Sequence, residues 1–210
     1  VMALINKQKK TTEYDWFTFT FNQKEYLELR WPNRDTLFFC RYLSKLDLKN
    51  IDSCIEVCTW SGFIGQYLEH KFKQQWREDY HVTYNDINSE SYTLFKTKIE
   101  TRSNNNFISW DWAKAIQIKR RDLILCNPPY IPRKWSVEDN AYEGLELAQN
   151  ILKNLDTALT PNGKLLINLS SLSMDIMEPI FEEMKKQWRS IQCVQWQKVP
   201  LKVLNTLNNE

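Results

Sequence analysis

The feature that most constrains the fold of this chain is a regular alternation of apolar runs with segments of helical spacing between residues 51 and 197. The apolar runs predict strands at Cys54–Val57, His81–Asn85, Phe107–Trp110, Asp122–Cys126, Lys164–Leu169 and Ile191–Gln197. Helices are predicted between them at Gly62–Phe72, Ser89–Thr101, Glu143–Leu159 and Asp175–Trp188. Such alternation is typical of βαβ units, so we expect an α/β fold with a largely parallel sheet and helices on both faces. A last extended stretch, Val199–Leu207, is expected to return as an antiparallel edge strand.

The N-terminal region has a different pattern. Apolar and polar residues alternate with period two over Trp16–Phe21 and again over Tyr26–Trp31, with a polar turn between them, which predicts a β-hairpin. Asp35 is then placed to cap a helix with apolar residues at helical spacing. We therefore expect residues 1–50 to form a hairpin-and-helix extension and residues 51–210 to form the main domain.

The composition narrows the classes of function. With 42% hydrophobic residues and a net charge of +2, the 210-residue chain has enough apolar material for one core. It lacks the strong positive charge of a protein that mainly grips a phosphate backbone. Five cysteines, an odd number, favour reduced thiols, and their spacing with the two histidines predicts no metal site. No apolar run approaches the roughly 18 residues that span a bilayer, and no signal-peptide pattern is present, so the cytoplasm is the expected location.

Polar residues follow four of the predicted strands, where ligands of open α/β sheets bind. The turn from Glu56 to Gly62 follows the first strand, Asp86 the second, Asp111 the third and Asn127 the fourth. A carboxylate after the second strand suits the hydroxyls of a ribose, although a helix cap or turn residue is the alternative for Asp86. Asp111, between two tryptophans, suits an adenine amino group or is an ordinary loop carboxylate.

The turn Asn127-Pro128-Pro129-Tyr130 is the most specific signal in the chain. Neither proline has a backbone N–H, so the turn presents carbonyl acceptors with few competing donors. A substrate –NH2 can donate one hydrogen to the Asn127 side-chain oxygen and one to the Pro128 carbonyl, while Tyr130 packs on the planar group. The alternative is a rigid turn that ends a buried strand.

Together these residues resemble a known family. The stretches SWDW at 109–112 and DLILCNPPYIP at 122–132 look like the glutamine N5-methyltransferases of the HemK/PrmC type, which modify peptide-chain release factors. Further matches fall in family order, so the resemblance spans Trp31 to Leu169. It implies a seven-stranded, mostly parallel, Rossmann-like methyltransferase sheet, with S-adenosylmethionine as the methyl donor and a protein as the substrate.

The resemblance also implies a role for each site residue. The catalytic wall that holds the acceptor amide would be Asn127, Pro128, Pro129 and Tyr130. The cofactor-binding residues would be Glu56, Cys58 and Gly62 for the methionine portion, Asp86 for the ribose, Asp111 and Trp112 for the adenine, and in addition Ile87 and Asn127.

The chain also departs from the family. Glycines normally stand where this sequence has Cys58 and Trp60, and of the three only Gly62 remains. Bacterial members carry an N-terminal helical substrate-binding domain, whereas the residues before Ser53 predict a hairpin. In this the chain is similar to shorter members, some of which work with a small partner subunit.

Two other functions fit the same residues. An adenine N6-methyltransferase acting on DNA or RNA would present an exocyclic –NH2 to the same acceptors, with a flipped base and a strand-binding surface. A non-catalytic scaffold would keep the fold without the cofactor, and Cys58 and Trp60 are the residues that favour it.

Overall fold

The computed structural model describes residues 9–22, 32, 34–98, 105–109, 111–130, 145–187 and 190–197. The chain divides into two compact units, Val1–Asn127 with Leu155–Ile167, and Pro128–Asn154 with Asn168–Glu210. The first unit contains the sheet. The second contains helix α5 (Glu146–Lys153), the 3-10 turn η3 (Ser171–Ser173) and helix α7 (Met174–Lys186), and α5 contacts α7.

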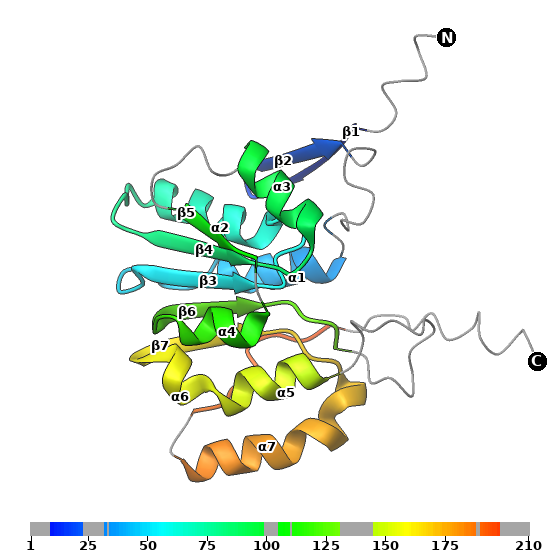
Figure 1. The fold of residues 1–210 in the computed structure, drawn as a ribbon, viewed down its shortest axis with the longest axis vertical. Helices are drawn as coiled ribbons and strands as arrows, with labels where there is room; N and C mark the ends of the chain where they lie inside the picture. The colour runs from blue at the N-terminus through cyan, green and yellow to red at the C-terminus, as the bar shows by residue number, and fades with distance from the viewer. Residues whose placement is uncertain are drawn as a thin grey trace, which may run out of the picture. The chain divides into compact units, whose positions relative to one another are not determined.

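Within the described residues, the main sheet of the first unit has five strands, all paired in parallel (Figure 1). In spatial order they are β5 (Asn105–Ile108), β4 (His81–Asn85), β3 (Ser53–Val57), β6 (Arg121–Cys126) and β7 (Leu159–Ile167). Along the chain they alternate with helices α2 (Phe63–Gln74), α3 (Ser89–Lys98), α4 (Trp112–Gln117) and α6 (Leu155–Ala158). The predicted α/β fold with a parallel sheet is confirmed.

The predicted count of seven strands in one sheet is not matched by the described residues. Ile191–Gln197 forms no strand. Three glutamines interrupt its apolar residues, and Val194 is 43% exposed and Trp196 is 74% exposed, so the segment does not bury an apolar face. The predicted edge strand Val199–Leu207 lies outside the described residues.

Most other boundaries agree with the sequence pattern, with three corrections. Strand β5 begins at Asn105 rather than Phe107. Strand β7 begins at Leu159 rather than Lys164. A register shift separates its first pair, Arg121 with Leu159, from the next pair, Leu123 with Lys164. The single helix predicted over Glu143–Leu159 is two helices, α5 and α6, separated at Asn154, and its first two residues lie outside the described ones. Helix α4 was not predicted.

An N-terminal hairpin is present and includes the first predicted strand, Trp16–Phe21, with bounds shifted by one residue. Strand β2 (Phe17–Asn22) pairs antiparallel with the preceding β1 (Lys9–Tyr14), and Tyr26–Trp31 lies outside the described residues. Asp15 and Trp16 form a two-residue turn with φ of 49° and 62°. Positive φ at both positions is the type I′ geometry that matches the twist of a hairpin. Asn-Gly usually forms this turn, so Asp-Trp gave no signal.

The hairpin packs on helix α2. The Phe17 and Phe19 rings lie 5.5 and 5.2 Å from the ring of Phe63. The Tyr67 hydroxyl donates a hydrogen bond to Asp15 Oδ2 over 2.7 Å, and Lys71 Nζ lies 3.2 Å from the same oxygen. Phe19, Phe63 and Tyr67 belong to the main hydrophobic core, which also includes α1 (Arg34–Leu43) and the sheet. Asp35, predicted to cap α1, lies inside its first turn.

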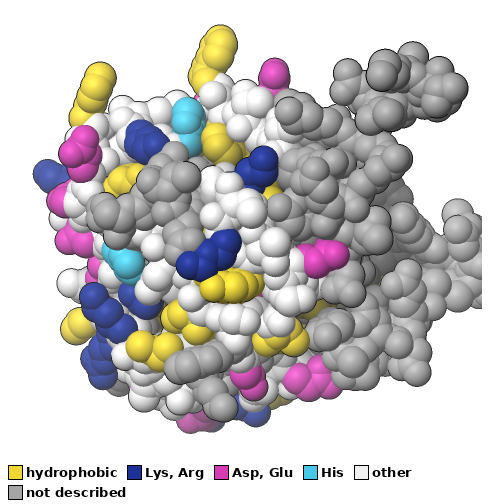
Figure 2. Space-filling view, turned by 45° about the horizontal axis from the view of Figure 1, so that its top comes forward, with side chains coloured by type: hydrophobic (Ala, Val, Ile, Leu, Met, Phe, Trp, Pro, Cys, Tyr) yellow, Lys and Arg dark blue, Asp and Glu magenta, His cyan; other side chains and the backbone are white. Residues whose placement is uncertain are grey.

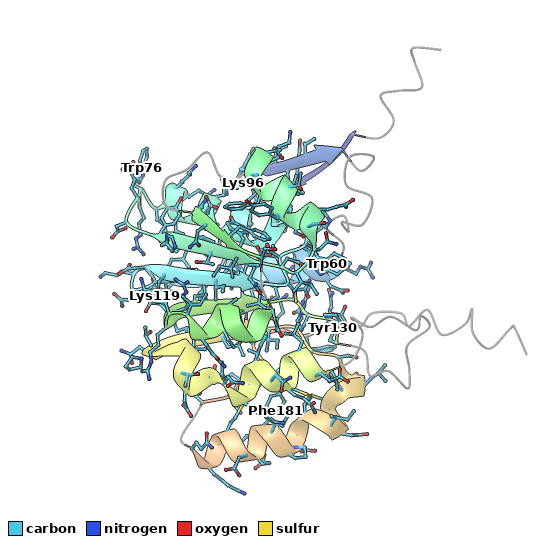
Figure 3. The ribbon with its side chains drawn as sticks, in the orientation of Figure 1. Trp60, Trp76, Lys96, Lys119, Tyr130 and Phe181 are labelled. Atoms are coloured by element: carbon cyan, nitrogen blue, oxygen red, sulfur yellow. The ribbon has the colours of Figure 1, made fainter. Side chains whose placement is uncertain are left out.

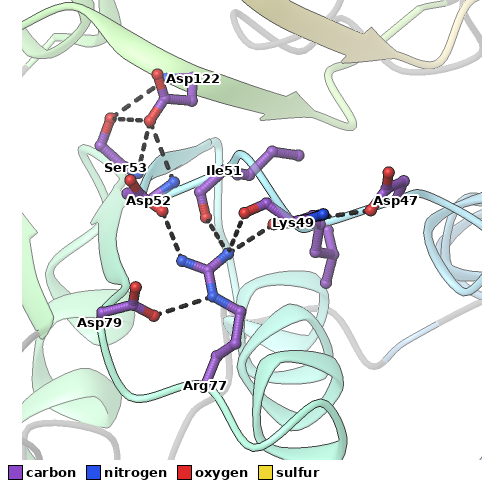
Figure 4. A network of polar contacts seen from close by, with 9 residues as sticks. Asp47, Lys49, Ile51, Asp52, Ser53, Arg77, Asp79 and Asp122 are labelled. Carbon is purple, nitrogen blue, oxygen red and sulfur yellow. Dashed lines mark hydrogen bonds and ion pairs between the residues drawn. The ribbon is translucent and has the colours of Figure 1, made fainter.

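Polar contacts fix the amino ends of the central strands (Figure 4). The Arg77 guanidinium donates to the carbonyls of Leu48 and Ile51 over 2.6 and 3.0 Å and pairs with Asp52. Asp122 Oδ2 accepts the Ser53 N–H over 3.0 Å, which ties β6 to β3. The polar side chains at this end of the sheet therefore stabilise the fold. Among the described residues, no helix has the length and apolar character that crossing a membrane requires.

Candidate active site

Strand register brings the ends of the central strands to one edge. Val57, the last residue of β3, is paired with Asn85 at the end of β4 and with Cys126 at the end of β6. From β3 the chain continues to β4 on one side, and β6 lies on the other side. This is the topological switch point of the sheet, where ligands of open α/β folds bind.

Three predicted site residues lie directly beyond these paired ends. Cys58 follows β3, Asp86 follows β4 and Asn127 follows β6. Asn127 is half-buried, as is Cys58, and Asp86 is 9% exposed. The structure therefore places one predicted site residue after each of three strands, at the same edge of the sheet.

The loop between β3 and α2 has an unusual backbone. Cys58, Trp60 and Gly62 have φ of 57°, 49° and 72°, so every second residue is in the left-handed region. That region favours glycine, because a Cβ approaches the backbone closely there. These are the three positions at which the resembled family has glycines. The loop therefore keeps a glycine-type conformation at Cys58 and Trp60 without glycine.

Asp86 holds this loop from the neighbouring strand. Its Oδ2 accepts the backbone N–H of Trp60 over 2.8 Å, and its Oδ1 accepts the N–H of Asn88 over 2.9 Å. Burial raises the pKa of Asp86, while these N–H donors act in the opposite direction. Figure 3 shows Trp60 at the carboxyl end of β3. The contact between Asp86 and Trp60 was missed by sequence reasoning, because nothing in the pattern links a carboxylate to a residue 26 positions earlier.

Glu56 lies beneath the loop and is 3% exposed. Its Oε2 accepts the Thr59 hydroxyl over 2.6 Å and the Gly65 N–H over 2.9 Å, so it joins the loop to the first turn of α2. Burial raises the pKa of Glu56 to about 8, although both hydrogen bonds oppose the shift. The Glu56 carboxyl therefore fixes the shape of the loop from within the protein.

The residues predicted to contact adenine and ribose lie farther along the same edge. Ile87 follows Asp86 and is 54% exposed. Asp111 is exposed, and its carbonyl accepts the Ala115 N–H over 3.1 Å at the start of α4. Trp112 is the first residue of α4. Trp110 lies outside the described residues.

The acceptor turn continues from β6. Pro128 is buried, and Pro129 and Tyr130 are half-buried. Pro128 is the first residue of the second unit, while Asn127 belongs to the first. Arg133 and Lys134 lie outside the described residues. Across the described part of the chain, no three His, Cys, Asp or Glu side chains gather in a way that would hold a metal ion.

The chain is similar in sequence and in fold to methyltransferases. A ribosomal protein L11 methylase from Lactobacillus delbrueckii subsp. bulgaricus superposes with a TM-score of 0.54 at 16% identity, covering 74% of this chain and 70% of that one, which shows the fold. A ribosomal protein uL3 glutamine methyltransferase from Francisella tularensis is 26% identical over 148 residues. That match covers 63% of this chain and 46% of the relative, so the chain spans about half the relative's length. Residues 41–195 match the family model described as the methyltransferase small domain. The chain belongs to the methyltransferase small domain family.

Proposed function

We propose that this chain transfers a methyl group from S-adenosylmethionine to a planar, amide-like nitrogen, and that the nitrogen belongs to a protein glutamine side chain. The observation that carries the proposal is the meeting of Cys58, Asp86 and Asn127 at the switch point of the sheet. Family membership supports the reaction class, and the glutamine-specific relative supports the acceptor.

The residues present fit the cofactor. The Asp86 carboxylate accepts backbone N–H groups, among them those of Trp60 and Asn88, and a carboxylate is an acceptor that suits the hydroxyls of a ribose. The loop from Glu56 to Gly62 would lie against the methionine portion, with Asp111 and Trp112 at the adenine and Ile87 beside them. When bound, the cofactor supplies a methyl group on a positively charged sulfur.

An amide nitrogen is a weak nucleophile because its lone pair is delocalised. As it forms the new bond it gains positive charge, which the Asn127 side-chain oxygen and the Pro128 carbonyl would stabilise by accepting its hydrogens. Pro128 and Pro129 have no N–H to compete for these acceptors. Tyr130 would pack on the plane of the amide and fix its direction. Positioning and fixed dipoles then supply the rate, without a general base before transfer, and the extra proton of the methylated nitrogen would leave to solvent afterwards.

The acceptor could also be an adenine, whose exocyclic amine would fit the same oxygens. A nucleic-acid substrate needs a positively charged surface. On the face drawn in Figure 2, Lys and Arg side chains are mixed with Asp and Glu, and the net charge is only +2. These observations favour a protein acceptor, such as a ribosomal protein or a peptide-chain release factor, with or without a small partner subunit.

The test is an acceptor panel. The purified chain is incubated with isotope-labelled S-adenosylmethionine and, separately, ribosomal protein uL3, a release factor and single-stranded DNA. The proposal expects label on a glutamine of one of the proteins, located by mass spectrometry. Label on adenine would identify the alternative reaction, and failure to bind S-adenosylmethionine in calorimetry would indicate a scaffold.

A further inference from the structure

We propose that Asp86 is a positioning residue that holds Trp60 in its left-handed conformation, so that the loop after β3 keeps a glycine-type shape around a tryptophan. This role is separate from any contact between Asp86 and the ribose. The test of this role by cofactor affinity rests on the proposed function, whereas the test by amide hydrogen exchange does not.

The backbone of Trp60 lies in the left-handed region. At φ of 49°, its Cβ meets the steric penalty that confines most non-glycine residues to negative φ. A residue in such a conformation persists only where its surroundings over-determine it. The loop therefore needs an interaction at Trp60 that a glycine at this position would not require.

The Trp60 N–H donates a hydrogen bond to the Asp86 carboxylate. Its Oδ2 lies 2.8 Å from the Trp60 nitrogen, and Asp86 is 9% exposed. A shielded bond to a charged acceptor is stronger than a neutral one in water. Asp86 is itself fixed by the N–H of Asn88, so the carboxylate does not turn to follow the loop.

Hydrogen bonds also hold the loop on either side of Trp60, at Thr59 and at Gly62. The Thr59 N–H donates to the Asn85 carbonyl over 3.0 Å, and the Gly62 N–H donates to the Thr59 carbonyl over 2.7 Å. Thr59 is also held through its hydroxyl by Glu56. Trp60 lies between these ties, and the bond from its N–H to Asp86 Oδ2 adds a tie at the middle of the loop.

The two possible roles of Asp86 respond differently to Trp60→Gly. A direct contact between Asp86 and the ribose is lost to the same extent whatever residue stands at position 60. A positioning role matters less once glycine removes the strain, because glycine reaches positive φ without a Cβ clash. A double-mutant cycle therefore separates them.

The experiment measures S-adenosylmethionine affinity by calorimetry for wild type, Asp86→Ala, Trp60→Gly and the double variant. We expect Asp86→Ala to weaken binding about tenfold more in the wild-type background than in the Trp60→Gly background, the size of one bond to a charged group. Asp111→Ala is the matched control, and its loss should be equal in both backgrounds. Equal losses for Asp86→Ala in both backgrounds would overturn the proposal.

A second readout needs no cofactor. Amide hydrogen exchange is followed at Trp60 and, as a control for global stability, at Ile55 in buried β3. Asp86→Ala should speed exchange at Trp60 about tenfold while leaving Ile55 unchanged. Unchanged exchange at Trp60 would overturn the positioning role. If wild type binds no S-adenosylmethionine, the proposed function fails, and this exchange measurement alone decides the role of Asp86.

Discussion

Glu56 Oε2 accepts a hydrogen bond from the Gly65 N–H over 2.9 Å, and this bond joins the end of β3 to the first turn of α2. Glu56 is almost fully buried, and its pKa is raised to about 8. A carboxyl group thus supports the loop between β3 and α2 from a position that solvent does not reach. Its protonation is linked to the stability of the fold.

The pH dependence of stability tests this linkage. The folded state holds the Glu56 proton more tightly than the unfolded chain, whose glutamate pKa is about 4.3. Its stabilising contribution is therefore complete below that pH and is lost as pH rises through about 8. Between pH 5.5 and 7.5 the free energy of unfolding should fall more steeply in wild type than in Glu56→Gln, by up to about 1.4 kcal/mol per pH unit. Parallel denaturation profiles for the two proteins would show that Glu56 is ionised when folded.

Gly65→Ala should destabilise the protein. A Cβ at Gly65 would lie 2.4 Å from Tyr84 Cε1 and 2.6 Å from Glu56 Oε2, and both side chains are buried. Overpacking of this kind costs about 1–3 kcal/mol. Urea denaturation measures it, with Lys73→Ala on an exposed position of the same helix as the control. A loss no larger than that of the control would mean that the first turn of α2 moves freely.

Cys58→Gly should stabilise the protein. Relief of the left-handed conformation at φ of 57° outweighs the added freedom of the unfolded chain, for a net gain of about 0.5–1 kcal/mol. Cys193 is exposed and is not in the left-handed region, so Cys193→Gly should give no gain. Thermal or chemical denaturation of the two variants provides the comparison. A loss of stability in Cys58→Gly would show that packing of the Cys58 side chain exceeds the strain.

Tyr67→Phe tests how the hairpin is held on α2. It removes the hydroxyl that donates to Asp15 Oδ2 and leaves a carboxylate with one partner fewer. The expected loss is about 1.5–3 kcal/mol, the range for bonds to charged groups. Tyr92→Phe, at a 40% exposed position, should cost far less. Similar stabilities for the two variants would indicate that the aromatic contacts alone dock the hairpin.

The parallel sheet was predictable because its strands are apolar and short and are separated by helices. Strand β4, at His81–Asn85, has the predicted bounds, and β3 and β6 begin only one residue earlier. Two other patterns gave less. Ile191–Gln197 was predicted as a strand but forms none, and Val194 and Trp196 in it are exposed. Phe17–Asn22 pairs with the polar strand Lys9–Tyr14, which has no apolar alternation to signal it.

The site was predictable at the level of strand ends, since parallel strands that end in register place the following residues together. Asp86 and Asn127 were selected on that ground. The conformation of the loop was not predictable, because Cys58 and Trp60 are not residues that signal positive φ. The hydrogen bond from the Trp60 N–H to Asp86 was not predictable either, because it depends on the path of the loop past the end of β4. The roles predicted for the site residues, from Glu56 and Asp86 to Asn127 and Tyr130, remain predictions.

The most direct test of the whole account is methyl transfer by Asn127→Ala. Single-turnover rate and S-adenosylmethionine affinity are measured for wild type, Asn127→Ala and the exposed control Asn106→Ala, with the acceptor found in the panel. Loss of an acceptor that acts on developing charge should lower the rate of Asn127→Ala by about 100-fold or more. Cofactor affinity should stay within about threefold of wild type, because Asn127 is one of several residues expected beside the cofactor, whereas its side-chain oxygen is the expected acceptor for the amide. Turnover within a few-fold of wild type would contradict the claim that Asn127 holds the nitrogen that is methylated.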